Sequence, residues 1–285
     1  MCLNPFYVSR ETIKSSGEVY YHFVGRNVFD NREDEFSKVE CIPIPCRNCV
    51  DCQVISSNEW TNRCMLELKR HSQSCMITLT YAGECSSVVK ADVQFFIQDL
   101  RNYVRPQKIR YFACGEYGKL GQRPHYHIIV FGWRPDDLAE FFVRDGHKVY
   151  LSDTVSDLWG RGYITVEDVS RETCRYTAKY LQKLNPPPEG CTPAFLMMSL
   201  KPPIGYTPDL VRGALSDGKI YLDGNVYPIP KSLLKSAKRR LDVPDVIDGN
   251  RKRKSDCLDF ERILLNKKYK YKNIIDAQKK IKKNA

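Results

Sequence analysis

The sequence has no apolar run of about 20 residues, the length that a helix needs to cross a bilayer. Its first residues, MCLNPFYVSRET, also lack the apolar segment of a secretory signal peptide. We therefore expect neither a membrane anchor nor secretion, and the cytoplasm is the simplest compartment. The 12 cysteines are spread through a long chain without such a signal, which favours reduced thiols or metal binding over disulfides.

The positive charge of the chain is unevenly placed. Hydrophobic residues make up 42% of the 285 residues, enough for one domain of about 180 to 230 residues with appendages. Residues 1–230 hold 27 Lys and Arg against 27 Asp and Glu, whereas residues 231–285 hold 18 against 7. The net charge of +11 thus belongs to the tail.

Basic clusters in this tail would attract nucleic acid by releasing counterions from the phosphate backbone. The cluster that we select as a DNA-binding candidate consists of Arg251, Lys252, Arg253 and Lys254. The alternative is a solvated or disordered basic tail without a defined site.

Two histidines flank a tyrosine in RPHYHIIVFG, residues 123–132, a stretch typical of a strand bounded by proline and glycine. Side chains alternate along a strand, so His125 and His127 project from one face and can converge on one metal ion. Tyr126 then points to the opposite face. The alternative interpretation is an ordinary strand with an alternating polar face.

A second apolar strand, RYFACGEYG at residues 110–118, carries Glu116 just before a glycine-containing turn. If the two strands pair as a hairpin, Glu116 comes near both histidines. Two imidazoles and a carboxylate, with room for water or a phosphate oxygen, suit Mg²⁺ or Mn²⁺. As an alternative, Glu116 is a solvated carboxylate of the turn.

The segment SRETCRYTAKYLQKL, residues 170–184, has helical periodicity and no Gly or Pro. Tyr176 and Tyr180 are four residues apart, so both phenols share one helical face and can reach a single phosphate site. Each is followed three residues later by a lysine, Lys179 or Lys183. A phenol with a pKa near about 10 is a poor nucleophile, and a nearby cation would stabilise phenolate or phosphate. Ordinary half-buried packing of the tyrosines is the alternative.

Three cysteines follow one another at intervals of three residues in PCRNCVDC. Cys-x-x-Cys spacing suits zinc, because a short turn brings two thiolates onto one tetrahedral ion. The candidate ligands of a structural Zn²⁺ are Cys46, Cys49, Cys52 and Cys64. Cys2 or Cys41 could instead complete the set, and reduced cysteines at the start of a helix are the main alternative.

The periodicity of the remaining segments predicts the fold. Residues 75–83 and 162–169 are expected as strands, and residues 49–70, 91–104 and 134–143 as helices. Thr78 and Thr80 share one face of the first of these strands, where both can line the site. With the hairpin and the tyrosine helix, the order from residue 75 is β-α-β-β-α-β-α. This order predicts an α+β fold with a central antiparallel sheet and flanking helices, in ferredoxin-like or RRM-like layers.

We expect four parts along the chain. They are a cysteine-containing N-terminal segment packed on the core (1–72), the core itself (73–185), a linker with short strands (186–230) and the basic tail (231–285). Within the linker, Asp223 and Gly224 are expected to form a hairpin turn.

The motifs together resemble a known family. The combination of HYH, an upstream strand glutamate and a downstream YTAKYLQK helix resembles the HUH-endonuclease superfamily of rolling-circle replication initiators, whose first motif is similar to MITLTY. MCLNP, PCRNCVDC with EWTNRCMLE, CGEYG, RPHYHIIVFG and YTAKYLQK resemble, more narrowly, the replication-initiation proteins of gokushoviruses, which are small single-stranded DNA phages. The resemblance covers roughly residues 1–185, with the motifs in the same order.

This resemblance implies an HUH-endonuclease core that nicks origin DNA sequence-specifically with a divalent metal. Tyr176 or Tyr180 would become linked to a 5′ phosphate, leaving a 3′-OH as a primer, and strand transfer would later close the circle. Glu116, His125 and His127 would hold Mg²⁺ or Mn²⁺. The implied partners are single-stranded and duplex origin DNA and the host replication machinery, in the cytoplasm of the host cell.

Two other function classes remain open. A non-catalytic nucleic-acid-binding module with an RRM-like sheet and a basic tail predicts sheet aromatics in an RNP pattern, which the sequence does not contain. A zinc metallohydrolase predicts three neutral ligands and an activated water, and it gives the tyrosine helix no role.

Overall fold

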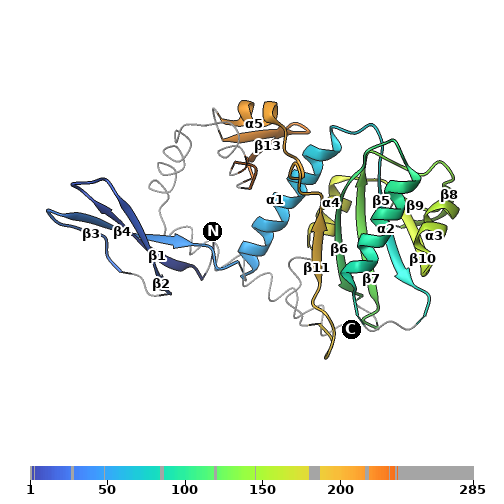
Figure 1. Ribbon diagram of the computed structural model, residues 1–285, viewed down its shortest axis with the longest axis horizontal. Helices are drawn as coiled ribbons and strands as arrows, with labels where there is room; N and C mark the ends of the chain where they lie inside the picture. Colours follow the sequence, from blue (N-terminus) through green and yellow to red (C-terminus); the bar gives the residue numbers. More distant parts are fainter. Residues whose placement is uncertain are drawn as a thin grey trace.

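The computed structural model describes residues 2, 4–26, 29–47, 49–83, 87–118, 121–144, 146–179, 187–215, 218–230, 232–234 and 236. Its largest element is a seven-stranded sheet in which all neighbouring strands run antiparallel (Figure 1). In spatial order the strands are β11 (Phe195–Met198), β6 (Arg110–Tyr117), β7 (Pro124–Phe131), β5 (Ser74–Tyr81), β10 (Gly162–Glu167), β9 (His147–Leu151) and β8 (Ala139–Arg144).

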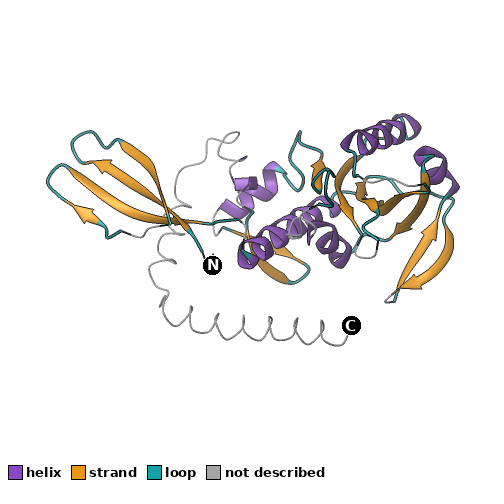
Figure 2. Cartoon of the chain, turned by 90° about the horizontal axis from the view of Figure 1, so that it is seen from below, coloured by secondary structure: helices purple, strands orange, loops and turns teal. Residues whose placement is uncertain are grey.

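Helices cover both faces of this sheet (Figure 2). They are α2 (Lys90–Tyr103) and α3 (Asp153–Trp159) on one face, and α1 (Val50–Leu68) and α4 (Arg171–Lys179) on the other. Alternate residues of β7 supply the two cores: Ile128 and Val130 pack on the α2 side, and Ile129 and Phe131 on the α1 side. The predicted α+β fold, an antiparallel sheet with flanking helices, is thus confirmed.

Most elements that periodicity predicted in the core are present. The strands expected at 75–83, 110–118, 123–132 and 162–169 are β5, β6, β7 and β10, and the helices expected at 49–70 and 91–104 are α1 and α2. The helix expected at 170–184 is α4 as far as Lys179, and residues 180–184 lie outside the described residues. Within the described part of the chain, no helix has both the length and the apolar character needed to span a membrane.

The prediction of a helix at residues 134–143 was wrong. This stretch instead leads into strand β8, which forms a hairpin with β9. The Asp137 carboxylate accepts hydrogen bonds from the Ser152 hydroxyl (2.6 Å) and the Thr154 backbone N–H (2.7 Å), so it is held at the start of α3. The run Phe141–Val143 that follows also favours a strand, because aromatic and β-branched residues fit a pleated surface.

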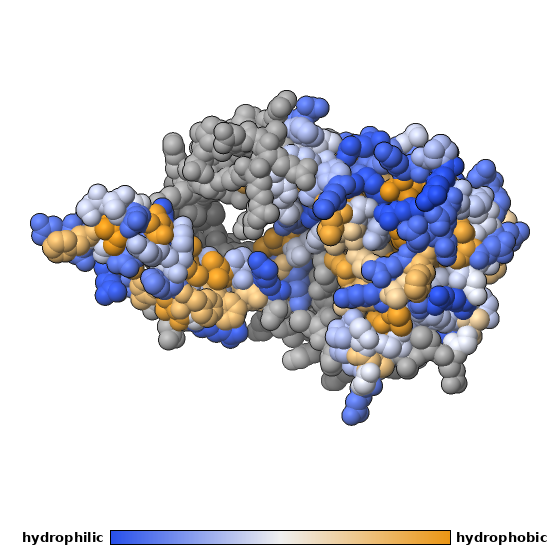
Figure 3. All heavy atoms as spheres, in the orientation of Figure 1, coloured by the Kyte–Doolittle hydropathy of each residue, from blue (hydrophilic) through white to orange (hydrophobic). Residues whose placement is uncertain are grey.

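A second sheet, with four strands, projects from the core beyond the start of α1 (Figures 1 and 2). Its strands, in spatial order, are β2 (Val19–Gly25), β1 (Phe6–Ile13), β4 (Ser37–Ile44) and β3 (Arg32–Glu33). Ser37 is the only buried residue in these four strands, all of which the structure describes. Apolar side chains such as Phe23, which is 68% exposed, therefore lie at the surface of this sheet (Figure 3).

The stretch expected as a linker with short strands contributes to the core. β11 pairs with β6 and extends the large sheet at its edge. The hairpin expected around Asp223 and Gly224 is present as β12 (Lys219–Leu222) and β13 (Asn225–Pro228). The positive φ angles of the two turn residues, 51° and 76°, match a two-residue hairpin turn. Helix α5 (Pro208–Leu215) precedes this hairpin.

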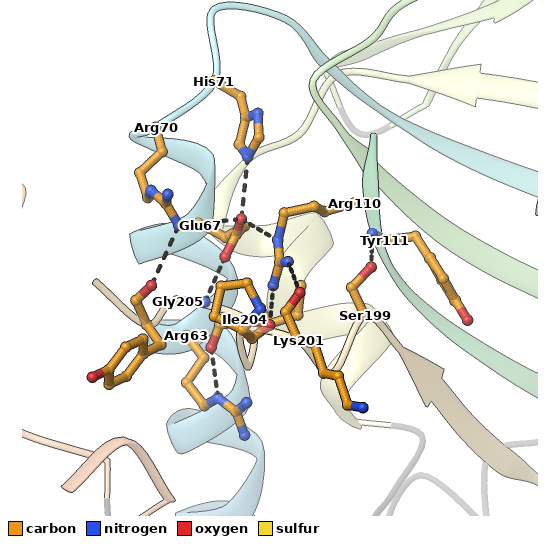
Figure 4. A network of polar contacts seen from close by, with 12 residues as sticks. Arg63, Glu67, Arg70, His71, Arg110, Tyr111, Ser199, Lys201, Ile204 and Gly205 are labelled. Carbon is orange, nitrogen blue, oxygen red and sulfur yellow. Dashed lines mark hydrogen bonds and ion pairs between the residues drawn. The ribbon is translucent and has the colours of Figure 1, made fainter. Parts of the chain in front are cut away.

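Glu67, which is fully buried in α1, connects this stretch to the core (Figure 4). Its carboxylate accepts hydrogen bonds from Arg110 Nε of β6 (2.7 Å) and from the Gly205 backbone N–H (2.6 Å), and it lies 3.1 Å from His71 Nε2. Gly205 has φ +75°, and a Cβ there would lie 2.6 Å from the Arg63 carbonyl oxygen, so only glycine fits against α1. One carboxylate thus joins α1, β6 and the loop after β11.

Candidate active site

The pleat of β7 sets the directions of the HYH side chains. His125 and His127 lie on the α4 side of the sheet with their ring centroids 4.9 Å apart. Tyr126 is fully buried on the other side, where its hydroxyl accepts a hydrogen bond from the Val89 backbone N–H (2.8 Å) and shares one with Tyr81 (2.6 Å). The structure therefore brings the two imidazoles together on one face.

Glu116 lies beside both imidazoles, because β6 pairs with β7 and places Glu116 directly across from His125. Its Oε1 atom is 2.8 Å from His125 Nε2 and 3.4 Å from His127 Nε2. The ligand atoms of the three residues all lie within 4.8 Å of one another. Glu116 is only 1% exposed, and a carboxylate so deeply buried needs cationic or hydrogen-bonding partners.

The second nitrogen of each imidazole has its own partner. His125 Nδ1 lies 3.0 Å from the Arg123 carbonyl oxygen, and His127 Nδ1 lies 3.0 Å from the Thr78 hydroxyl. A carbonyl oxygen only accepts, so His125 donates from Nδ1, and the Nε2 of the neutral ring is then an acceptor that faces a carboxylate oxygen. Two acceptors at 2.8 Å need a cation between them, either a proton or a metal ion. This donor set therefore fits a divalent cation.

Helix α4 brings Tyr176 to the same place. The Ser170 hydroxyl caps the helix by accepting hydrogen bonds from two backbone N–H groups of the first turn. Cys174 and Ala178 are buried against the sheet, and Tyr176, on the other side of the helix, is 47% exposed. Its ring centroid is 5.1 Å from that of His127, with the two planes at 83°. The phenol is thus both close to the histidines and open to a large substrate.

Several predicted site residues lie beyond what the structure describes. Tyr180 and Lys183 are outside the described residues, and so is the side chain of Lys179 at the end of α4. The basic cluster from Arg251 to Lys254 is outside them as well. Their proposed roles rest on the sequence alone.

The cysteines form a group, but with a different fourth member. The thiols of Cys46, Cys49 and Cys52 gather with that of Cys2, and all four sulfur atoms lie within 4.8 Å of one another. Cys64 does not belong to this group, which corrects the expected set. It follows Cys52 by twelve residues within α1, a separation of about 18 Å along a helix. Cys64 is instead fully buried near Cys174, and burial raises the pKa of its thiol well above the usual range.

Sequence reasoning missed the Arg123 carbonyl, a backbone group that no residue pattern can reveal. It placed Thr78 and Thr80 on the site face without distinguishing them. In the structure the Thr78 hydroxyl contacts His127, and Thr80 receives the Trp159 indole N–H on its backbone carbonyl (3.1 Å). Cross-strand register, which pairs Thr78 with His127, is what selects between them.

Comparisons with known proteins identify the relatives of this segment. Residues 74–185, from β5 through α4, match the family model of the replication-associated protein ORF2. The chain is 34% identical over 153 residues to the replication-associated protein ORF2 of Spiroplasma virus 4, covering 49% of this chain and 48% of that protein. It is 31% identical over 150 residues to the replication-associated protein VP4 of Bdellovibrio phage phiMH2K, with coverage of 49% and 48%.

A third relative is the replication-associated protein ORF4 of Chlamydia phage 1, which is 30% identical over 152 residues, with coverage of 50% of this chain and 38% of that protein. The chain thus spans half or less of the length of these relatives. No solved structure matches the chain. The resemblance indicated by the motifs is confirmed: the segment that carries the two histidines, Glu116 and Tyr176 is similar to the replication-associated proteins of gokushovirus-type phages.

Proposed function

We propose that this chain initiates rolling-circle replication of a single-stranded DNA phage by nicking origin DNA through a tyrosine. The observation that carries the proposal is the position of Tyr176, whose ring centroid lies 5.1 Å from that of His127, beside a carboxylate and a second imidazole. The names of the relatives support a role in replication. The proposal adds the chemistry.

Glu116, His125 and His127 would hold the divalent ion, Mg²⁺ or Mn²⁺, since two imidazoles and a carboxylate leave coordination positions open. When bound, this ion supplies Lewis acidity toward the scissile phosphate. Thr78 and the Arg123 carbonyl engage the Nδ1 atoms, so both Nε2 atoms are held toward Glu116.

Tyr176 would then act as the nucleophile. Its phenol oxygen forms a bond to phosphorus while the bond from phosphorus to the 3′ oxygen breaks. The phenol proton passes to solvent and the departing oxygen takes up a proton, which leaves a 5′-phosphotyrosine and a free 3′-OH. The phosphodiester is conserved in the adduct, so attack by a 3′-OH reverses the step and closes a circle without ATP.

The sequence suggests a second nucleophile and two assisting cations. Tyr180 would follow Tyr176 by one helical turn, and Lys179 and Lys183 would stabilise phenolate or phosphate. Single-stranded and duplex origin DNA would be the substrates. The host replication machinery would extend the 3′-OH, in the cytoplasm of the host cell.

The other function classes fit the fold less well. A nucleic-acid-binding module of the RRM type stacks bases on an open sheet face, whereas helices α1 to α4 cover both faces of the large sheet. A zinc metallohydrolase has no use for a half-exposed phenol beside its ligands.

The proposal is tested by incubating the full chain with Mn²⁺ and single-stranded oligonucleotides that tile the genome encoding it. We expect a covalent protein–DNA band on a denaturing gel, and its loss on chelation. Tyr176→Phe and Tyr180→Phe should each retain some adduct, and the double variant should form none. Tyr103→Phe, which alters an exposed tyrosine on α2, is the matched control and should react normally.

Mass spectrometry of the trapped peptide locates the linkage. An adduct outside residues 170–184, or one that persists in the double variant, would overturn the assignment of the nucleophile. The absence of any adduct with every oligonucleotide would overturn the nickase itself.

A further inference from the structure

The N-terminal four-stranded sheet has no hydrophobic core of its own. Every residue of β1 is only partly buried, and most of β2 is exposed. In the part of the chain that the structure describes, neither hydrophobic cluster contains a residue before Trp60. Small units without a core are stable only with a disulfide, a metal ion or a partner. Something other than apolar packing must therefore hold this sheet.

The cysteine group lies where the sheet meets α1. Cys46 follows β4, Cys49 is the N-cap residue of α1 and Cys52 lies in its first turn, while Cys2 comes from the chain segment just before β1. Cys52 is buried and the other three are partly buried. The four thiols thus join both ends of the sheet to the start of the helix.

The distances among the sulfur atoms fit a single tetrahedral ion. Zn–S bonds of about 2.3 Å place tetrahedral ligands about 3.8 Å apart. Cys2 Sγ and Cys49 Sγ are 3.7 Å apart, and every pair in the group lies within 4.8 Å. A disulfide instead requires a bond of about 2.05 Å. The thiols are spaced for a shared ion.

The local backbone is shaped to converge these thiols. Arg47 has a left-handed φ of 64°, which turns the chain between Cys46 and Cys49. The Cys49 backbone N–H donates to Cys46 Sγ, and the Cys46 backbone N–H donates to Cys2 Sγ, both at 3.3 Å. Such donors stabilise thiolates, the form that binds metal, as does the positive end of a helix.

We propose that Cys2, Cys46, Cys49 and Cys52 bind one Zn²⁺ ion, which fixes the N-terminal sheet to the first turn of α1. Four protein ligands complete a tetrahedral site and leave no open position, so this zinc is structural and not catalytic. The proposal does not depend on the nicking reaction, because these residues are separate from the group that contains Glu116.

The first measurement is the metal content of the full-length protein, purified from zinc-supplemented medium, by inductively coupled plasma mass spectrometry. We expect about one tightly held zinc ion per chain, as in structural sites. Cys49→Ser and Cys2→Ser should lose it. Cys41→Ser, which alters a partly buried cysteine of β4 outside the group, is the matched control and should keep it. His125→Ala should also keep it, which excludes the other candidate metal site as its location.

A cobalt experiment on the unaltered chain avoids relying on variants that fail to fold. Co²⁺ replacing the ion should give the visible absorption of a tetrahedral thiolate site, with thiolate-to-cobalt charge-transfer bands. Zinc should then displace it. In Cys2→Ser, amide hydrogen exchange in β1 to β4 should rise at least about tenfold, while exchange in β5 to β7 stays unchanged.

Three results would overturn the proposal. They are four thiols that react freely with iodoacetamide in native protein without bound metal, a mass deficit showing disulfides among them, and iron in place of zinc. Equal loss of zinc in Cys41→Ser would likewise reject the assigned ligands. A normal zinc content in a chain that forms no DNA adduct would leave this proposal standing and reject only the nickase.

Discussion

The Thr78 hydroxyl lies 3.0 Å from His127 Nδ1, and the other nitrogen of the same ring lies 3.4 Å from Glu116 Oε1. One strand, β5, thereby orients a side chain of its neighbour β7, because the register pairs Thr78 with His127. A partner on the outer nitrogen of a ligating histidine fixes the ring and its tautomer. Thr78 is thus a positioning residue for the proposed metal site.

Thr78→Val keeps the shape of the side chain and removes the hydroxyl. We expect the affinity for Mn²⁺ to fall about 10-fold or more, as for other outer partners of metal ligands. Titration calorimetry with Mn²⁺ measures this without DNA. Thr80→Val is the control on the same strand face, and its affinity should be unchanged. Equal losses in the two variants would show a general effect on the strand.

His127→Ala and His125→Ala should each remove a metal ligand. Cleavage of origin DNA should fall by at least about 100-fold, because loss of a ligand exceeds the loss of an outer partner. The far-ultraviolet circular dichroism and the thermal midpoint should change little, since neither residue is part of a hydrophobic cluster. His147→Ala, on exposed β9, is the control. Near-normal nicking by either ligand variant would refute the metal site.

The parts of the fold that could be predicted are those that local periodicity determines. Alternation in β7 was enough to place His125 and His127 on one face, and the apolar stripe of α2 was enough to predict its buried side. The turn at Asp223 and Gly224 has a local signature of its own. Each of these features depends on residues within a few positions of one another.

The features that were missed depend on distant contacts. Cys2 joins Cys49 across 47 positions, and no spacing rule connects them. The predicted helix at 49–70 already placed Cys52 and Cys64 too far apart for one ion, so two predictions from the same sequence were inconsistent. Asp137 could not be recognised as a partner of Ser152 without tertiary structure, and the run from 134 to 143 was therefore predicted as a helix.

Glu67→Gln should destabilise the fold. The substitution keeps the shape of the side chain but leaves the mostly buried Arg110 guanidinium, 2.7 Å away, without its counter-charge. Removing one partner of a buried ion pair costs about 3 kcal/mol or more, and urea unfolding should show this destabilisation. Glu33→Gln, which breaks an exposed ion pair of 2.9 Å with Lys14, should leave the unfolding midpoint unchanged. Equal midpoints for both variants would contradict the role of Glu67.

Removal of the basic tail should weaken duplex DNA binding and flatten its dependence on salt. The chain must be cut after Ser236, because Leu233 and Leu234 are buried and Ser232 donates to Glu59 (3.0 Å). Residues 237–285 lie outside the described residues and hold 16 Lys and Arg against 7 Asp and Glu.

Fluorescence anisotropy with a labelled duplex at several salt concentrations measures this effect. The slope of log Kobs against log salt should fall by about 0.9 for each phosphate that the truncated protein no longer neutralises. A full-length variant with Gln at Arg251, Lys252, Arg253 and Lys254 separates charge from chain length, and its slope should lie between those of the two other chains. An unchanged slope after truncation would show that the duplex is bound by the folded part of the chain, whose residues 1–230 carry 27 basic and 27 acidic side chains.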